Sequence, residues 1–275
     1  MSRGCRFLRN LALGILPLLA ILFLCGAGIP ENPEKEENPL PEDGRVYSDL
    51  GQGTFCLIRD AFVYIPEHCD DNTGYLLHYA GGTGGLDDWV LQQQYPEYYL
   101  REYRPNAVCV FFKGSGLRDI PAACERTGEL LAELGELTGV RPEKIAVSAA
   151  SNGGYTALHA ACRLYTDYGI RTDRILLLDM GDSWSKEELL ITGEEAAPLL
   201  EMGTTVYALG AEGDAFTLPG AQKFASSGVP LIEVVSRKRN HDEMTVEAFQ
   251  EGVLSFLLGE SARLNEKRYT LNPVN

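Results

Sequence analysis

The sequence predicts an α/β fold in which a mostly parallel sheet carries helices on both faces. Apolar runs of strand length alternate with helical patterns from about residue 54 onward, which is typical of a sheet joined by crossover helices. The later apolar runs are nearly continuous, as expected for parallel strands covered on both faces. One such run ends at Ser148 and is followed by Gly153, Gly154 and a helical pattern. This order indicates a strand that turns sharply into a helix.

Strands are predicted where aliphatic, β-branched and aromatic residues cluster between turn residues. They cover residues 54–66, 74–80, 106–112, 143–149, 174–180, 204–210 and 229–235. Helices are predicted where apolar residues recur at helical spacing. They cover residues 96–103, 120–138, 153–168, 186–201, 220–227 and 243–258. The crossovers that these helices provide are expected to be right-handed.

Residues 1–29 have the composition of a targeting segment. Three arginines precede the uncharged apolar run 11–29, a pattern of export signals and of uncleaved membrane anchors. As a helix this run would rise roughly 28 Å, close to a bilayer core of about 30 Å. The arginines favour a cytoplasmic N-terminus with the rest of the chain outside. We expect an exported protein, extracellular or on the cell surface, whose segment is a cleaved signal, an anchor or a lipoprotein signal ending at Cys25.

Residues 30–44 form a Pro- and Glu-rich linker, and residues 45–275 form one domain. The linker is poor in apolar residues, so we expect an extended, solvated chain. The whole chain of 275 residues is 45% hydrophobic, which suits one good-sized globular domain. Its net charge is −15, without a basic stripe, and this excludes nucleic acid as a partner.

Five cysteines follow the linker. Cys109, Cys124 and Cys162 lie in apolar patterns and are expected to be buried as small hydrophobic residues. Cys56 and Cys69 flank a predicted strand and its turn, and an exported protein could join them in a disulfide. The sequence has no CxxC motif or His/Cys cluster, so it predicts neither a structural zinc site nor any other metal or cofactor.

Two acidic residues and an asparagine follow one another in the sequence HCDDNTG. Asp70, Asp71 and Asn72 could in principle bind calcium, but their spacing fits no known loop. Asp and Asn are common in tight turns, where they bond to the backbone. A turn between two strands is therefore the favoured interpretation.

Ser151 stands between a predicted strand and a predicted helix. A nucleophile on such a sharp turn needs small residues two positions before and after it. Ala149 and Gly153 meet this requirement, in an A-x-S-x-G pattern in place of the usual G-x-S-x-G. The alternative is that Ser151 caps the helix, a favoured role for serine. The motif alone leaves these two interpretations open.

A serine nucleophile needs a histidine base that a carboxylate orients. His241 follows the last predicted strand and precedes the last helix, which is where the base of such a fold belongs. Asp214 lies in the loop after the strand at 204–210, so the order Ser, Asp, His suits it as the acid. Asp179 and Asp182, one strand earlier, are the competing acids.

Backbone amides are needed to stabilise the oxyanion of an acyl-transfer reaction. The amide of Asn152, directly after Ser151, is one candidate. The second should come from the glycine-rich loop LLHYAGGTGG at residues 76–85, whose glycines allow close backbone approach. A phosphate-binding loop is disfavoured because the GxGxxG spacing and a P-loop lysine are missing.

These motifs resemble those of the secreted esterases of the α/β-hydrolase superfamily, including polyhydroxybutyrate depolymerases, feruloyl esterases and esterase D-like enzymes. The similarity rests on DAFVYIPEHC, LLHYAGGTGGLDDW and RPEKIAVSAASNGGYTALHAAC and covers about residues 55–258. It implies the α/β-hydrolase fold. The insert at about 181–203 is short, and its length predicts a small lid over an open pocket. By position the resemblance implies a nucleophile, an acid and a base, and a second oxyanion amide near Ala80 or Gly81. The resemblance assigns these three catalytic roles to Ser151, Asp214 and His241, respectively.

We therefore expect a serine hydrolase that cleaves carboxylic esters through an acyl-enzyme and needs no cofactor. Its substrate would be a small-molecule or polysaccharide-linked ester, and the N-terminal segment would provide membrane contact. Trp89 and Trp184 could line the substrate site or simply pack in the core. A serine peptidase with the same triad is one alternative. A non-catalytic binding protein on a hydrolase scaffold is the other.

Overall fold

The computed structural model of the protein describes residues 45–49, 53–59, 61–81, 100, 105–112, 119–180, 191, 193–211, 232–237, 257–259 and 270–272. These residues belong to one compact unit, Glu42–Asn275. Its strands are β1 (Arg45–Asp49), β2 (Gly53–Ile58), β3 (Ala61–Pro66), β4 (Gly74–Tyr79), β5 (Ala107–Phe112), β6 (Lys144–Ala150), β7 (Arg171–Leu178), β8 (Thr205–Ala211), β9 (Ile232–Arg237) and β10 (Thr270–Asn272). Its helices are α3 (Ile120–Thr138), α4 (Gly153–Tyr168), η2 (Gly193–Ala196) and α5 (Ala197–Met202).

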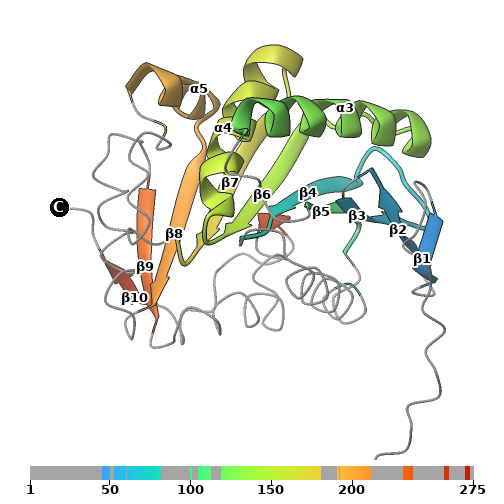
Figure 1. Ribbon diagram of the computed structural model, residues 1–275, viewed down its shortest axis with the longest axis horizontal. Coiled ribbons are helices and arrows are strands. Elements are labelled where there is room, and N and C mark those ends of the chain that lie inside the picture. The colour runs from blue at the N-terminus through green and yellow to red at the C-terminus, as the bar shows by residue number, and fades with distance from the viewer. Residues whose placement is uncertain are drawn as a thin grey trace, which may run out of the picture. The chain divides into compact units, whose positions relative to one another are not determined.

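The strands form one sheet in the order β1-β2-β3-β5-β4-β6-β7-β8-β9-β10. The six strands from β5 to β9 in this order are parallel. The first three strands and β10 add antiparallel edges. The predicted α/β class with a mostly parallel sheet is confirmed. Because parallel strands end at a common edge, the carboxyl ends of β4, β6, β7, β8 and β9 lie along the same edge of the sheet (Figure 1).

The run 54–66, predicted as one strand, is two strands that form an antiparallel hairpin. In this hairpin Phe55 pairs with Tyr64 and Ile58 with Ala61. The turn begins at Arg59, whose φ is +53°, a backbone conformation that interrupts a strand. The polar pair Arg-Asp in the middle of an apolar run was the sequence signal for this break.

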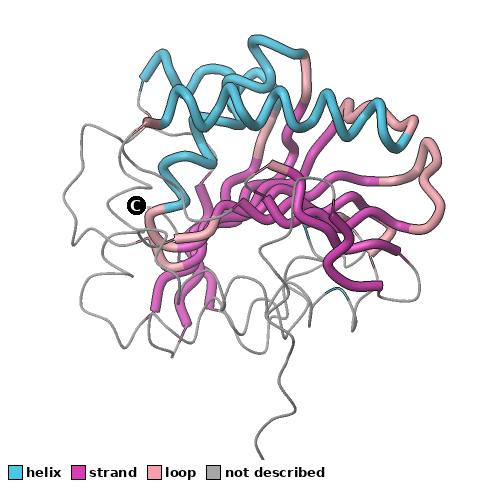
Figure 2. Tube along the Cα trace, turned by 45° about the vertical axis from the view of Figure 1, so that its right-hand side comes forward, coloured by secondary structure: helices cyan, strands magenta, loops and turns pink. Residues whose placement is uncertain are grey.

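Helices α3, α4 and α5 cover one face of the sheet. Figures 1 and 2 show α3, α4 and α5 on the same side of the strands. Buried side chains of these helices join those of the strands in one cluster, which includes Leu131, Leu158 and Leu199. Only α5 and η2 are described within the predicted helix 186–201, and their buried residues pack into this core. Residues 181–190, the first part of the expected lid, lie outside the described residues.

Helix ends follow from local sequence. The side chain of Asp119 accepts a hydrogen bond of 3.0 Å from the Ala122 amide and so begins α3. Both α3 and α4 end at a left-handed glycine, Gly139 with φ +72° and Gly169 with φ +71°, the usual helix C-terminus. The predicted bounds of both helices are confirmed.

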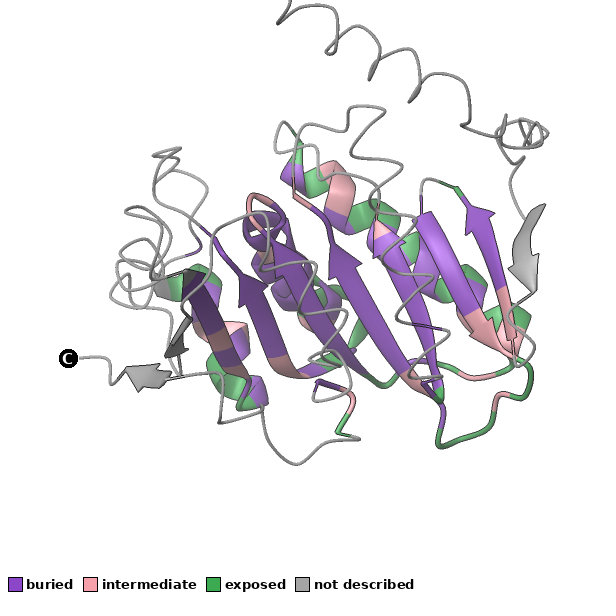
Figure 3. Ribbon diagram, turned by 90° about the horizontal axis from the view of Figure 1, so that it is seen from below, coloured by how far each residue is buried: buried purple, intermediate pink, exposed green. Residues whose placement is uncertain are grey.

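The opposite face of the sheet holds a second apolar cluster, built on Phe55, Phe62, Phe111 and Leu176. Leu100 and Leu257 pack into it; both are helical and fall in the helices predicted at 96–103 and 243–258. Figure 3 shows that the central strands are buried along most of their length. The sheet is therefore covered on both faces, as the continuous apolar runs predict.

The acidic sequence after β3 forms a turn, as predicted. The Asp70 carboxylate accepts a hydrogen bond of 2.9 Å from the Asn72 amide, and the Asp70 carbonyl accepts one of 2.9 Å from Thr73. The five cysteines of the domain are free thiols, so Cys56 and Cys69 are not joined. The Cys56 thiol instead donates to the Val63 carbonyl across the hairpin, at 3.6 Å.

Candidate active site

Ser151 occupies the sharp turn between β6 and α4. Its φ is +47°, in the left-handed region that costs a non-glycine residue free energy and that clusters at functional sites. The Ser151 amide donates a hydrogen bond of 2.8 Å to the Leu178 carbonyl, and the Ser151 carbonyl accepts one of 3.2 Å from Gly154. These bonds hold the strained turn between β7 and the helix. The side chain is half-buried, so it is not sealed inside the core.

The helix-cap interpretation of Ser151 is wrong. The N-cap of α4 is Asn152, which has φ −60° and ψ −20° and makes no side-chain capping bond. A capping serine would have an extended backbone and would bond the amides of the first turn. Ser151 has neither feature.

Small residues around Ser151 are required by close packing. A methyl group on Gly153 would lie 2.2 Å from the Tyr79 carbonyl oxygen, far inside van der Waals contact. Ala149 is fully buried in β6, opposite Tyr79. Both positions of the A-x-S-x-G pattern are therefore limited by size.

The backbone at Gly81 reaches Ser151. A methyl group on Gly81 would lie 2.7 Å from Cβ of Ser151 and 2.9 Å from the Ala150 carbonyl oxygen. The parallel pairing of Tyr79 with Ala149 brings the two chain segments to this contact. Three predicted residues, Gly81, Ser151 and Asn152, thus lie together at the carboxyl edge of the sheet. Ala80, the alternative to Gly81, is also described and is buried.

Asp179 follows β7 as Ser151 follows β6. The residues before them, Ala150 and Leu178, are paired, so Asp179 and Ser151 leave neighbouring strands at the same level. Asp179 also has a positive φ, +55°, and its amide donates to the Leu209 carbonyl at 2.8 Å. Its side chain is buried. The structure thus places one of the competing acids next to the candidate nucleophile.

A buried histidine–serine pair lies just below this edge. Nδ1 of His78 in β4 is 2.8 Å from Oγ of Ser148 in β6. Burial lowers the pKa of His78 to about 3, so the ring is neutral near pH 7. This pair was not predicted from the sequence. Its signal was one polar residue near the end of each of two apolar runs, GYLLHYA and EKIAVSA.

Several predicted site residues lie outside the described residues, and their roles stay predictions. They are Asp214, His241, Trp89, Trp184 and the competing acid Asp182. Along the chain, Asp214 is three residues beyond Ala211, the end of β8, and His241 is four residues beyond Arg237, the end of β9. Both strands run parallel to β6. They therefore end at the edge where Ser151 lies.

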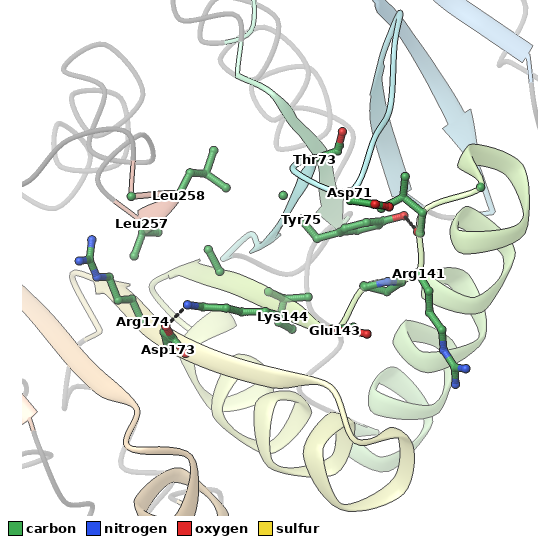
Figure 4. Close-up of a pocket in the computed structure, with 17 residues that line it drawn as sticks. Asp71, Thr73, Tyr75, Arg141, Glu143, Lys144, Asp173, Arg174, Leu257 and Leu258 are labelled. Atoms are coloured by element: carbon green, nitrogen blue, oxygen red, sulfur yellow. Dashed lines mark hydrogen bonds and ion pairs between the residues drawn. The ribbon is translucent and has the colours of Figure 1, made fainter.

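A cavity of about 850 Å³ lies at the opposite, amino edge of the sheet. Tyr75, Lys144 and Arg174 line it from β4, β6 and β7, together with Leu257 and Leu258 (Figure 4). Lys144 forms an ion pair with Asp173, and the Tyr75 hydroxyl donates to the Val140 carbonyl at 2.8 Å. The cavity contains none of the predicted catalytic residues. The acidic and basic side chains that line it are equal in number.

Neither a metal-binding cluster nor a membrane-spanning helix occurs in the part of the chain that the structure describes. Within it, no three His, Cys, Asp or Glu side chains gather in a way that could hold a metal ion. No helix there is long and apolar enough to cross a membrane. The apolar run 11–29 lies outside the described residues.

The sequence matches no protein-family model, and no curated protein matches it. Solved structures do match the fold. An esterase from Pyrobaculum calidifontis superposes with a TM-score of 0.51 at 17% identity, over 74% of this chain and 81% of that one. The carboxylesterase EstE1 from a metagenomic library gives 0.50 at 15% identity, over 78% and 88%. A thermostable esterase from Pseudomonas putida gives 0.50 at 17% identity, over 78% and 86%. With these neighbours and this strand order, the chain has the α/β-hydrolase fold.

Proposed function

We propose that this protein is a serine hydrolase that cleaves carboxylic esters, with Ser151 as its nucleophile. One observation carries the proposal: Ser151 has a left-handed backbone between a buried strand and a helix, with the Gly81 backbone beside it. Such a turn presents a serine hydroxyl at the carboxyl edge of the sheet. Residues held in this strained conformation cluster at functional sites.

In the proposed reaction the Ser151 oxygen attacks the acyl carbon of the ester while His241 removes the hydroxyl proton. Asp214 orients the imidazole and stabilises its charged form. His241 then gives the proton to the departing alcohol, and water hydrolyses the acyl-enzyme by the same route. The short distance along the chain from each strand end to its catalytic residue supports these assignments. Three and four extended residues span at most about 11 and 14 Å, so Asp214 and His241 stay near the ends of β8 and β9.

The oxyanion of the tetrahedral intermediate would be stabilised by backbone amides. We assign one to Asn152, directly after the nucleophile, and the other to the segment at Gly81. The close approach of Gly81 to Ser151 supports it over Ala80. Losing one such donor typically lowers kcat by about 100- to 1000-fold.

Carboxylic esters are the proposed substrates because three solved proteins of the same fold are esterases. Small-molecule esters and esters linked to polysaccharides are both proposed substrates, and Trp89 and Trp184 are proposed to line the site. A peptidase would use the same residues on amides. Matched p-nitrophenyl ester and p-nitroanilide substrates separate the two activities.

We also propose that residues 11–29 export the protein and leave the domain outside the cytoplasm. The support is the arginine-preceded apolar run, which has the composition of a signal or anchor. A fusion to alkaline phosphatase, which is active only after export, tests this proposal. Activity should be lost when residues 1–29 are deleted, and an active fusion without them would contradict export.

Labelling of the full-length protein with a fluorophosphonate probe tests the proposed activity. The wild type should label, whereas Ser151→Ala and His241→Ala should not. His68→Ala, which changes an exposed histidine in the turn after β3, is the matched control and should label like the wild type. No labelling of a folded wild-type protein would contradict the hydrolase and favour a binding protein on this scaffold.

A further inference from the structure

Beneath the proposed active site, a buried side-chain hydrogen bond joins β4 to β6 within a mostly apolar layer. Nδ1 of His78 lies 2.8 Å from Oγ of Ser148, and the two residues are paired in the parallel register of the strands. Their side chains are 4% and 0% exposed. The neighbours on the same face are apolar: Leu76 precedes His78 by two residues, and Ala150 follows Ser148 by two.

The pair occupies a particular level in the sheet. His78 is three residues before Gly81, and Ser148 is three residues before Ser151. A strand rises about 3.3 Å per residue, so the hydrogen bond lies roughly 10 Å below the contact between Gly81 and Ser151. At this distance neither side chain touches a substrate bound at Ser151. Any effect of the pair on catalysis must act through the backbone of the two strands.

The two strands carry the two halves of the proposed site. β4 leads into Gly81, and β6 leads into Ser151 and Asn152. A methyl group on Gly81 would come within 2.7 Å of Cβ of Ser151, so the two segments are already as close as a glycine allows. A small lateral or axial shift between β4 and β6 would therefore move the oxyanion backbone relative to the nucleophile.

We propose that the His78–Ser148 hydrogen bond is a positioning device that fixes β4 against β6 and so sets the distance between Gly81 and Ser151. The proposal rests on the proposed function, since it concerns the geometry of the same site. Backbone bonds alone define the register of a ladder, but a side-chain bond adds a directional link at one level. The neutral ring that burial enforces keeps this link uncharged.

The chemistry of the pair supports this role. A neutral imidazole has one donor and one acceptor nitrogen, and a serine hydroxyl can match either. The pair can therefore form this bond without a charge on either side chain, and the ring of Phe111, with its centroid 6.1 Å from that of His78, packs beside it. Polar pairs in apolar layers are used elsewhere to specify register.

Kinetics of p-nitrophenyl acetate hydrolysis by the full-length protein test the proposal. Ser148→Ala and His78→Leu remove one partner each and should lower kcat by about 10- to 100-fold, because small misplacements of catalytic groups have effects of this size. KM should stay within about twofold. His78→Asn puts a polar atom at the position of Nδ1 and should restore most of kcat. The double variant should lose no more than the worse single one, since both break the same bond.

Thr204→Val is the matched control. The Thr204 hydroxyl donates a buried bond of 2.6 Å to the Thr172 carbonyl, directly before β8 and at the opposite edge of the sheet. Its loss should reduce stability and leave kcat within about twofold. The proposal is overturned if Ser148→Ala and His78→Leu keep wild-type kcat, or if Thr204→Val loses as much as they do. Should His78→Leu fail to fold, Ser148→Ala carries the same test.

Hydrogen exchange separates this proposal from the proposed hydrolase activity. The backbone amides of the β4–β6 ladder near the pair, where Leu77 is paired with Val147 and Tyr79 with Ala149, report on how firmly the two strands are held together, whether or not the protein hydrolyses esters. In Ser148→Ala these amides should exchange at least about tenfold faster than in the wild type, and in Thr204→Val they should not. Unchanged exchange in Ser148→Ala would overturn the positioning role. A wild type without activity, but with this exchange pattern, would overturn only the esterase.

Discussion

A methyl group placed on Cα of Gly153 would lie 2.2 Å from the carbonyl oxygen of Tyr79. The same methyl would lie 2.9 Å from the carbonyl oxygen of Ala80. Both oxygens belong to the backbone at the end of β4 and cannot rotate away. The first turn of α4 therefore rests directly on the segment that leads to Gly81, and a glycine at position 153 is a condition of the site's geometry.

We predict that Gly153→Ala lowers the free energy of unfolding by about 3 kcal/mol, because overpacking against fixed backbone has costs of this size. The same change should lower the ester hydrolysis rate by about 100-fold or more, since it pushes Tyr79 and Ala80 away from the turn. Urea unfolding and p-nitrophenyl acetate turnover measure the two effects.

Two other helical glycines calibrate this prediction. A methyl on Gly135 in α3 would have its nearest neighbour, Cδ of Pro142, at an ordinary 3.6 Å, so Gly135→Ala should stabilise the protein by up to about 1 kcal/mol. A methyl on Gly154 would meet the flexible side chain of Met180, so Gly154→Ala should cost less than Gly153→Ala. If Gly153→Ala and Gly135→Ala are equally stable, Gly153 does not lie as close to the Tyr79 carbonyl as the structure shows.

Replacement of the proposed nucleophile should separate stability from activity. Ser151 has φ +47°, and a non-glycine residue there is strained by roughly 1–2 kcal/mol. Ser151→Gly should therefore stabilise the protein by up to about 1 kcal/mol after the extra chain entropy of glycine is subtracted. Ser151→Ala keeps the Cβ and should keep the strain. Both variants should lose all fluorophosphonate labelling. Equal melting temperatures for the two would argue against stored strain at the turn.

The acid of the triad can be identified by isosteric substitution. We predict that Asp214→Asn lowers kcat by about 1000- to 10,000-fold, as loss of a carboxylate that orients the base does. Asp182→Asn should have an effect below about tenfold. Asp179 needs the same test, because it leaves β7 beside Ser151 and is buried. A large loss of kcat in Asp179→Asn alone would identify Asp179, which follows β7, as the acid of the triad in place of Asp214.

Local sequence was sufficient where a short-range interaction decides the structure. The ends of α3 and α4 were predicted correctly because a capping aspartate and two glycines fix them within a few residues. The turn at Asp70 was predicted for the same reason. The hairpin at Arg59 was missed, since an apolar run of thirteen residues also fits one long strand and a single polar pair within it is a weak sign of a turn.

Contacts between distant strands could be predicted only in part. The placement of Gly81 beside Ser151 followed from the fold that the motifs imply, because both segments leave parallel neighbours at one edge. The His78–Ser148 bond did not, since it joins residues 70 positions apart and depends on the register of β4 against β6. A shift of one residue would point one of these side chains to the other face, and the sequence does not specify that register.

The same pair makes the stability of the protein depend on pH. His78 has a pKa of about 3 in the folded protein because burial disfavours its charged form, whereas an exposed histidine in the unfolded chain has a pKa of about 6.5. Between these values the unfolded chain binds more protons, so the free energy of unfolding falls as the pH falls through this window. Above about pH 6.5 the histidine contributes no pH dependence.

We therefore predict that the stability advantage of the wild type over His78→Asn shrinks by about 3 kcal/mol between pH 7 and pH 4. Urea unfolding of both proteins at the two pH values measures this difference, in which the carboxylates common to both cancel. Thr204→Val, which also loses a buried hydrogen bond but no titrating group, should show a constant difference from the wild type. A constant difference for His78→Asn as well would mean that His78 takes up its proton equally in the folded and unfolded states, and the ring would then be open to water in the folded protein.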